Sequence, residues 1–398
     1  MTIMWRMAAM VAFLGVPAAC SGETPGAVRS PTPPVSPAAT ASAPPTTSPT
    51  PSDPIKQSRR WKDIKVPKLT SASGMIEVKA PGPRDAWAIG FEDSADDELG
   101  WGVLLRWDGS TWARVPLPWN RLEHLSALDV DGQDDVWISA GSKLARRSGG
   151  RWRTFKPFGI AENFFFRDIA VDKGRAVLLG DGPQLPFVVR WDGRKFTMQD
   201  YYDGARLNAI SFKSGHEWIV GATDHLKCEG VTPEIWHRGP AHTNWNGQVP
   251  HVRGGVLKSV WQTDPDDVWA VGEISSSEQE RDYQSGECID KRSDVPPVPL
   301  VMHWDGAAWK SVKLPAWNVS LTSVTAAGKN HVWASGVGPA DEIVFLHYDG
   351  EKWTREDRRG AAESSVNTTT IPGTSDLWSV GTINGTTDDA QAFVLRRR

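Results

Sequence analysis

A tryptophan-centred unit recurs along the chain and constrains its fold more than any other feature. The tryptophan lies in a short apolar run after a turn, as in "RDAWAIG" at 84–90 and "DDVWAVG" at 266–272. The intervals between copies run from 40 to 64 residues, which is typical of one supersecondary unit repeated as a propeller or solenoid. The equivalent positions are Trp87, Trp137, Val177, Trp218, Trp269, Trp333 and Trp378, with valine in the unit "GRAVLLG".

Each unit follows one plan of four predicted strands. An apolar alternating segment comes first, the tryptophan strand second, and a third strand such as "LVMHW" leads into Asp-Gly, after which a last strand starts at an aromatic residue. The Asp-Gly pairs predict type I′ hairpins, in which both residues take a positive φ. They lie at 108–109, 192–193, 305–306 and 349–350. The plan predicts the four-stranded antiparallel blades of a β-propeller.

Seven such units predict one all-β domain, a seven-bladed β-propeller over residues 59–398. They begin near residues 74, 125, 167, 207, 257, 321 and 364. The last unit lacks a fourth strand, whereas "RRWKDIKVP" at 59–67 has the pattern of a fourth strand without a blade. We therefore expect Trp61 to Val66 to complete the seventh blade, because closure removes the exposed sheet edge. The tryptophans are then predicted to pack between neighbouring blades.

The N-terminal residues predict an export signal and a stalk. Residues 1–20 have a basic start, a short apolar run and "VPAAC", which resembles a bacterial lipoprotein signal with Cys20 as the acylated residue. Ordinary cleavage near Ala18, with secretion, is the alternative. Residues 21–58 are rich in Pro, Ser, Thr and Ala, a composition that predicts a disordered linker. Lipid at Cys20 would place the propeller on the outer face of the cell membrane, and would be its only link to the membrane.

Charge and motifs argue against several function classes. The net charge of -4 gives no electrostatic footprint for nucleic acid. The chain has no G-x-S-x-G, H-E-x-x-H or phosphate-loop motif, so no catalytic residue, cofactor or metal site is predicted. Acidic stretches at 92–98 and 278–294 favour solvated loops over calcium sites, because neither has EF-hand spacing.

Two long loops between second and third strands each carry one cysteine. Cys228 lies in the loop 222–234 and Cys288 in the loop 273–299, on adjacent units. Outside the cytoplasm such a pair predicts a disulfide. A metal site that includes His225 is the alternative, although more ligands would be needed.

The connections between blades supply the candidate ligand-binding residues. They should lie on the same face as the long loops, and variable loops on a rigid scaffold often bind ligands. Aromatic and charged side chains there would suit a glycan or a peptide at the mouth of the central channel. In the alternative, they plug the channel or cap the blades. The candidates are Trp119, Phe164, Tyr201, Tyr202, Arg206, His251, Arg253 and Trp317.

The motifs "DDVWAVG" and "HWDGxxW" resemble those of secreted tryptophan-rich propellers of high-GC Gram-positive bacteria, relatives of sialidase-like (BNR) and photosystem II stability-factor-like propellers. "DGSTW" resembles the Asp-box of sialidase-type propellers without the residue between Asp and Gly. The resemblance implies the fold and no activity. We therefore expect a monomeric, surface-anchored binding or assembly module for a protein or a cell-wall glycan. The alternative is a glycoside-acting enzyme with Tyr201, Tyr202 or Tyr283 as nucleophile.

Overall fold

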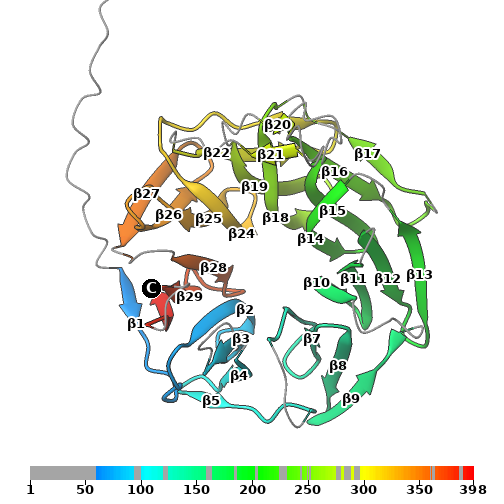
Figure 1. Ribbon diagram of the computed structural model, residues 1–398, viewed down its shortest axis with the longest axis vertical. Helices are drawn as coiled ribbons and strands as arrows, with labels where there is room; N and C mark the ends of the chain where they lie inside the picture. The colour runs from blue at the N-terminus through cyan, green and yellow to red at the C-terminus, as the bar shows by residue number, and fades with distance from the viewer. Residues whose placement is uncertain are drawn as a thin grey trace, which may run out of the picture. The chain divides into compact units, whose positions relative to one another are not determined.

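The computed structural model contains β-strands arranged as seven four-stranded antiparallel sheets and one two-stranded hairpin. The seven sheets stand around a central axis as blades (Figure 1), so the all-β seven-bladed propeller is confirmed. The compact unit spans Pro54–Arg398. Residues 60–398 are described except 94–99, 120–123, 158–163, 183–185, 202–204, 224–230, 243, 249, 251, 275–278, 282–287, 291–295, 359, 361–363 and 385–388.

Blades 1 to 4 each take four consecutive strands, ordered from the axis outwards. Blade 1 comprises β2 (Gly74–Gly82), β3 (Asp85–Glu92), β4 (Trp101–Trp107) and β5 (Trp112–Arg114). Blade 2 comprises β6 (Ala127–Val130), β7 (Val136–Ala140), β8 (Lys143–Ser148) and β9 (Arg151–Phe155). Blade 3 comprises β10 (Phe165–Asp172), β11 (Arg175–Asp181), β12 (Pro186–Trp191) and β13 (Phe196–Tyr201). Blade 4 comprises β14 (Ala205–Lys213), β15 (His216–Thr223), β16 (Thr232–Arg238) and β17 (Asn246–Gln248).

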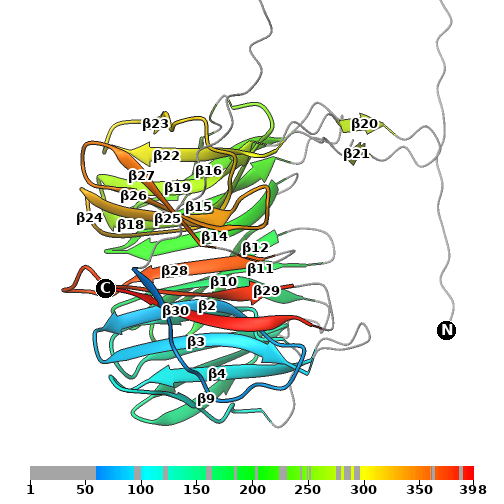
Figure 2. The same ribbon diagram turned by 90° about the vertical axis from the view of Figure 1, so that its left-hand side faces the viewer.

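Blades 5 to 7 complete the ring. Blade 5 comprises β18 (Gly255–Asp264), β19 (Asp267–Ile274), β22 (Val298–Trp304) and β23 (Trp309–Ser311). Between its second and third strands, β20 (Gln279–Arg281) and β21 (Cys288–Asp290) form a hairpin that stands to one side of the disc (Figure 2). Blade 6 comprises β24 (Ser320–Gly328), β25 (His331–Val337), β26 (Ile343–Tyr348) and β27 (Trp353–Arg358). Blade 7 comprises β28 (Ser365–Thr370), β29 (Leu377–Ile383), β30 (Gln391–Arg397) and β1 (Trp61–Asp63).

The ring closes through the pairing of its two chain ends, as the sequence predicts. In β1, Trp61 is opposite Arg397 of β30 and Asp63 is opposite Leu395. The pairing extends beyond β1, where the Ile64 amide donates to the Val394 carbonyl at 2.9 Å. The seventh blade therefore has its fourth strand, and its outer edge is built as in the other blades.

The second-strand tryptophans pack at the seams between blades, which confirms their predicted role. Trp87, Trp137, Trp218, Trp333 and Trp378 are at most 1% exposed. Each of them, with Trp269, contacts a residue of the following blade; Trp378, for example, lies 5.1 Å from Trp107 between ring centroids. Buried aromatic side chains in such edge-to-face or tilted contacts contribute strongly to the apolar stabilisation of a seam.

The hairpins between third and fourth strands differ from the predicted type I′ turns. The glycines of the four Asp-Gly pairs have φ of +92° to +100°, but no aspartate of these pairs is among the positive-φ residues. Instead the Asp108 carboxylate accepts hydrogen bonds from the Ser110 and Thr111 amides, both at 2.8 Å. The other three turns repeat this contact. Aspartate is needed there because its carboxylate satisfies loop amides, and only the glycine needs a positive φ.

A second set of contacts joins neighbouring blades around the axis. A side-chain oxygen on each first strand accepts a hydrogen bond from a backbone amide of the next blade's first strand, and seven such bonds close a circle. Inner strands have no ladder partner towards the axis, so these amides would otherwise stay unpaired. The acceptor and amide pairs are Glu77 with Leu128, Asp129 with Val171, Asp168 with Ile210, Ser211 with Gln262, Ser259 with Val324, Ser323 with Thr368 and Asn367 with Val78.

Candidate functional site

The central channel contains a polar cavity of about 190 Å³ lined by the first strands. At its wall the Lys79 ammonium lies 3.1 Å from a Glu77 oxygen and 3.8 Å from an Asp129 oxygen. Burial opposes the charge on Lys79, but Glu77, Asp129 and Asp168 outweigh it and raise the pKa of Lys79. Burial raises the pKa of Asp129 to about 6 and, with the Glu77 charge nearby, that of Asp168 to about 7.

The acidic groups of the channel already have structural partners. Glu77, Asp129 and Asp168 each accept one of the amide bonds that join neighbouring blades. A role in closing the ring therefore accounts for these carboxylates. Within the described part of the chain, no group of three or more His, Cys, Asp or Glu is placed to hold a metal ion.

The structure places three predicted ligand-binding aromatics at different seams. Trp119 is partly buried against the cluster that contains Trp87. Phe164 packs against the cluster shared by blades 2 and 3, and its ring centroid lies 5.3 Å from that of Phe187. Trp317 packs against the cluster around Trp269. These three side chains are not brought together, and their contacts are those of the alternative in which they cap the blades.

The other predicted residues are described in part. Arg206 is exposed in β14, and Arg253 is exposed in the turn before β18. Tyr202, His251, Cys20 and Cys228 lie outside the described residues, as do the side chains of Tyr201 and Cys288. Their predicted roles in ligand binding, lipidation and disulfide formation stay predictions.

The remaining candidates for chemistry are Tyr283, the alternative nucleophile, and His225, the alternative metal ligand. Tyr283 and His225 both lie outside the described residues. The repeat-position tyrosine, Tyr348, donates its hydroxyl to the Gly350 carbonyl at 2.7 Å and packs against Trp353. This tyrosine has a structural role in the blade 6 hairpin.

A repeated three-residue arrangement supports most seams. In blade 2, Asp135 lies two residues before Trp137, and Arg146 of the third strand pairs with Asp135 while its guanidinium lies over the Trp137 ring at 5.3 Å. Blades 1 and 7 repeat the Asp, Trp and Arg set, blade 5 has Asp, Trp and His, and blades 4 and 6 have His, Trp and His. The equivalent trios are Asp85, Trp87, Arg106; His216, Trp218, His237; Asp267, Trp269, His303; His331, Trp333, His347; and Asp376, Trp378, Arg396.

Blade 3 departs from this arrangement at two of its three positions. Arg175 takes the place of the acid or histidine, and Val177 takes the place of the tryptophan, while Arg190 keeps the third-strand position. A cavity of about 270 Å³ lies here, between blades 3 and 4. We call this place seam 3–4.

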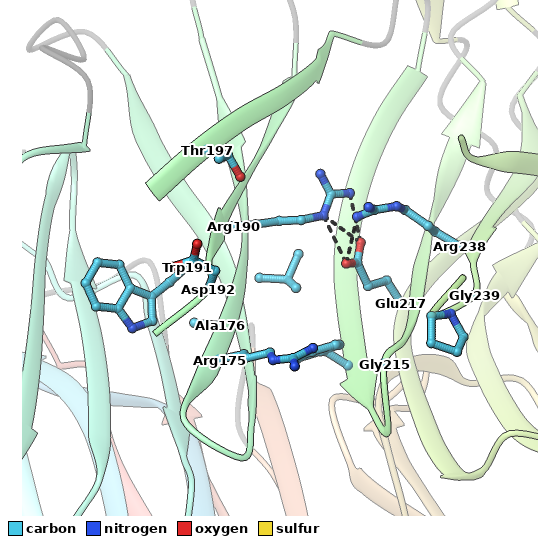
Figure 3. Close-up of a pocket in the computed structure, with 13 residues that line it drawn as sticks. Arg175, Ala176, Arg190, Trp191, Asp192, Thr197, Gly215, Glu217, Arg238 and Gly239 are labelled. Atoms are coloured by element: carbon cyan, nitrogen blue, oxygen red, sulfur yellow. Dashed lines mark hydrogen bonds and ion pairs between the residues drawn. The ribbon is translucent and has the colours of Figure 1, made fainter. Parts of the chain in front are cut away.

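Three arginines and two carboxylates line the cavity of seam 3–4 (Figure 3). The Arg190 guanidinium pairs with both oxygens of Glu217 at 2.8 to 3.0 Å, and Arg238 adds a contact to Glu217 at 3.1 Å. The side chains of Arg190 and Glu217 are only 11% and 7% exposed. Within the described residues, Arg175 has no ion pair, and it extends along the cavity in Figure 3. The remaining charged residue of the lining is Asp192.

Glu217 is itself a departure from the repeat. The residue directly before the second-strand tryptophan is aliphatic in the other blades, as with Val136, Val268 and Val332. In blade 4 it is a glutamate, and its carboxylate pairs with Arg190 across the seam. The two departures therefore belong together as one charged site.

Seam 3–4 opens beside short hairpins, not beside the long loops chosen from the sequence. Its lining includes Gly215 from the hairpin between β14 and β15, and Asp192 from the hairpin between β12 and β13. Val177 stands at the tryptophan position of the repeat, but a site at this seam was not among the predictions. Comparison of the repeats column by column would have shown the signal, because arginine stands where acids or histidines are usual.

The chain matches no known family model and no curated protein. Among solved structures, YCF48 bound to a D1 peptide is 15% identical, with 86% of this chain and 98% of that chain covered and a TM-score of 0.53. The Neurospora crassa Pan2 WD40 domain is 10% identical, with 86% and 97% covered and a TM-score of 0.53. A chain of the mitotic checkpoint complex is 10% identical, with 91% and 98% covered and a TM-score of 0.54. These likenesses show the propeller fold. Among the described residues, no helix has the length and hydrophobicity to span a bilayer.

Proposed function

We propose that the chain is a non-catalytic binding or assembly module that presents its propeller to a protein partner on the outer face of the cell membrane. The cavity of seam 3–4 is the observation that carries this proposal. Charged groups buried there stabilise a fold less than a packed apolar side chain would, since each loses hydration. The other seams are filled by an indole, so ligand binding gives a reason for the departures at Arg175, Val177 and Glu217.

A protein partner is favoured over a cell-wall glycan by the size and charge of the cavity. Pockets for drug-sized ligands hold roughly 300–1,000 Å³, so about 270 Å³ suits a single side chain more than a chain of sugars. A propeller of the same fold, YCF48, is known with a peptide bound. The loop-rich face, with Arg206 and Arg253 exposed, could extend the contact on a large partner.

Membrane anchoring through Cys20 is a separate part of the proposal. Wild-type protein and the Cys20→Ser variant should be expressed in a Gram-positive host fed with labelled palmitate. We expect label and membrane association for the wild type, and unlabelled protein in the medium for the variant. Equal release of both would establish plain secretion.

The binding role is tested by capture from solubilised cell envelopes with quantitative mass spectrometry. The baits are the full mature chain, its Arg175→Ala variant and the control Arg84→Ala, which alters an exposed arginine in the hairpin between β2 and β3. We expect a protein that wild type and Arg84→Ala retain and Arg175→Ala loses. Equal recovery by all three baits would show that seam 3–4 is not the binding site, and selective retention of cell-wall glycan would change the partner class.

A further inference from the structure

We propose that seam 3–4 binds an aromatic side chain that has a carboxylate beside it. This inference rests on the proposed binding function and specifies its ligand. An aromatic residue at a polypeptide C-terminus, or next to Asp or Glu, has this chemistry.

The shape of the site comes from the repeat itself. At the equivalent point of six other seams, the indole of the preceding blade's tryptophan fills the space between two blades. Val177 is much smaller than an indole, and the cavity of about 270 Å³ is lined by Val177 and Phe212. Phe212 packs with the buried Val177 and takes part of that space, and the cavity beside them is the place where an aromatic ring from outside would bind.

Seam 1–2 shows how two arginines hold an aromatic ring in this fold. The Arg106 guanidinium lies 5.0 Å from the Trp87 ring centroid, and Arg147 of blade 2 lies 5.4 Å from it. Arg190 occupies the repeat position of Arg106, and Arg238 occupies that of Arg147. The Arg190 guanidinium already lies over the Trp245 ring at 5.3 Å. A ring bound in seam 3–4 would therefore have the Arg238 guanidinium as its cation–π partner, which is favourable because the ring face is electronegative.

The carboxylate requirement comes from Arg175. Blades 1, 2, 5 and 7 have aspartate at this repeat position, and the third-strand Arg or His forms a hydrogen bond with it. In blade 3 the charge is reversed, and Arg190 is already paired with Glu217. Arg175 is exposed at the cavity and has no ion pair within the described residues. A ligand carboxylate would pair with Arg175. The acid–base pair of the other blades would then be present with the arginine on the second strand and the acid on the ligand.

Ligand-observed NMR titration of the full mature chain tests this inference with three small probes. N-acetyl-L-tryptophan carries ring and carboxylate, N-acetyl-L-tryptophanamide lacks the charge, and N-acetyl-L-leucine lacks the ring. We expect N-acetyl-L-tryptophan to bind, and the amide to bind about tenfold more weakly through loss of a charge-assisted hydrogen bond. The leucine probe should bind more weakly still. Equal affinity of all three probes, or binding of none, would overturn the inference.

Two variants locate the binding. Arg175→Gln should erase the difference between N-acetyl-L-tryptophan and its amide. Val177→Trp should abolish binding of both, because its indole fills the cavity; its fold is checked by circular dichroism. Unchanged discrimination by Arg175→Gln would contradict the assignment, as would displacement of the probe by sulfate at equal concentration, which marks a plain anion site. If envelope capture depends on Arg175 while no probe binds, the proposed function stands and this ligand class is wrong.

Discussion

Trp61 of β1 stacks on Phe345 of β26, with ring centroids 3.7 Å apart and planes 18° from parallel. Its indole N–H also donates to Glu356 at 3.1 Å, and its ring meets Trp333 edge-on at 6.4 Å. The closing strand is therefore attached to blade 6 by side chains and to blade 7 by its backbone. One residue near the start of the propeller thus secures the last seam of the ring.

Replacing Trp61 with alanine should destabilise the whole propeller. The side chain is 6% exposed, and removal of a buried aromatic costs about 3–5 kcal/mol. Urea denaturation gives the free energy of unfolding. The control is Trp101→Ala, because Trp101 is 40% exposed and its loss should cost less than about 1 kcal/mol. Similar values for both variants would argue against closure by Trp61.

Glu217→Gln should be among the most destabilising changes at seam 3–4. It removes the carboxylate shared by the Arg190 and Arg238 guanidinium groups. Loss of one partner from a buried pair costs about 3–5 kcal/mol, since a buried charge is left uncompensated. Asp266→Asn breaks the exposed pair with Lys329 and should cost less than about 1 kcal/mol. Equal loss of unfolding free energy in both variants would contradict the ion-pair assignment.

The paired histidines of blade 6 should make the fold sensitive to acid. Burial, together with the charges of His331 and Arg397, lowers the pKa of His347 to about 4, although Asp349 and Glu356 act in the opposite direction. The unfolded state then binds more protons between about pH 6.5 and pH 4, so this contribution is complete above pH 6.5 and is lost as pH falls towards 4.

A double variant isolates this effect. His331→Asp with His347→Arg copies the Asp135–Arg146 pair of blade 2 and should remove about 1–2 kcal/mol of acid lability, since the ring is only partly buried. Asp129 and Asp168 act in the opposite sense, because their raised pKa values favour folding at low pH. They are common to both proteins and cancel in the comparison. Parallel curves of unfolding free energy against pH would disprove the role of the pair.

The cysteine pair remains open to a direct assay. Cys228 and Cys288 belong to loops of adjacent blades, and we expect a disulfide between them in the exported protein. Thiol titration of the denatured, unreduced protein should find no free thiol when Cys20 is acylated, and two after reduction. Two free thiols before reduction would remove the prediction.

The sequence predicted the features that repeat and missed those that break the repeat. Blade number, the seam tryptophans and closure by Trp61 follow from a pattern present many times along the chain. The amide acceptors around the axis, such as Asp168, differ in residue type from blade to blade, and their partners are 42 or more residues away. Seam 3–4 depends on residues from two blades, so neither blade alone indicates it. The Asp-Gly turns were predicted correctly in place and wrongly in type, because the carboxylate decides their geometry.

Site-specific photo-crosslinking in intact cells tests the central claim, that seam 3–4 is the binding site. A benzoylphenylalanine replaces either Thr197 or Thr354. Thr197 is the second residue of β13 and lines the cavity of seam 3–4, and Thr354 is the second residue of β27, the equivalent strand of blade 6. We expect a partner adduct on irradiation from position 197 and none from position 354. The same adducts from both positions, or adducts from position 354 alone, would contradict it.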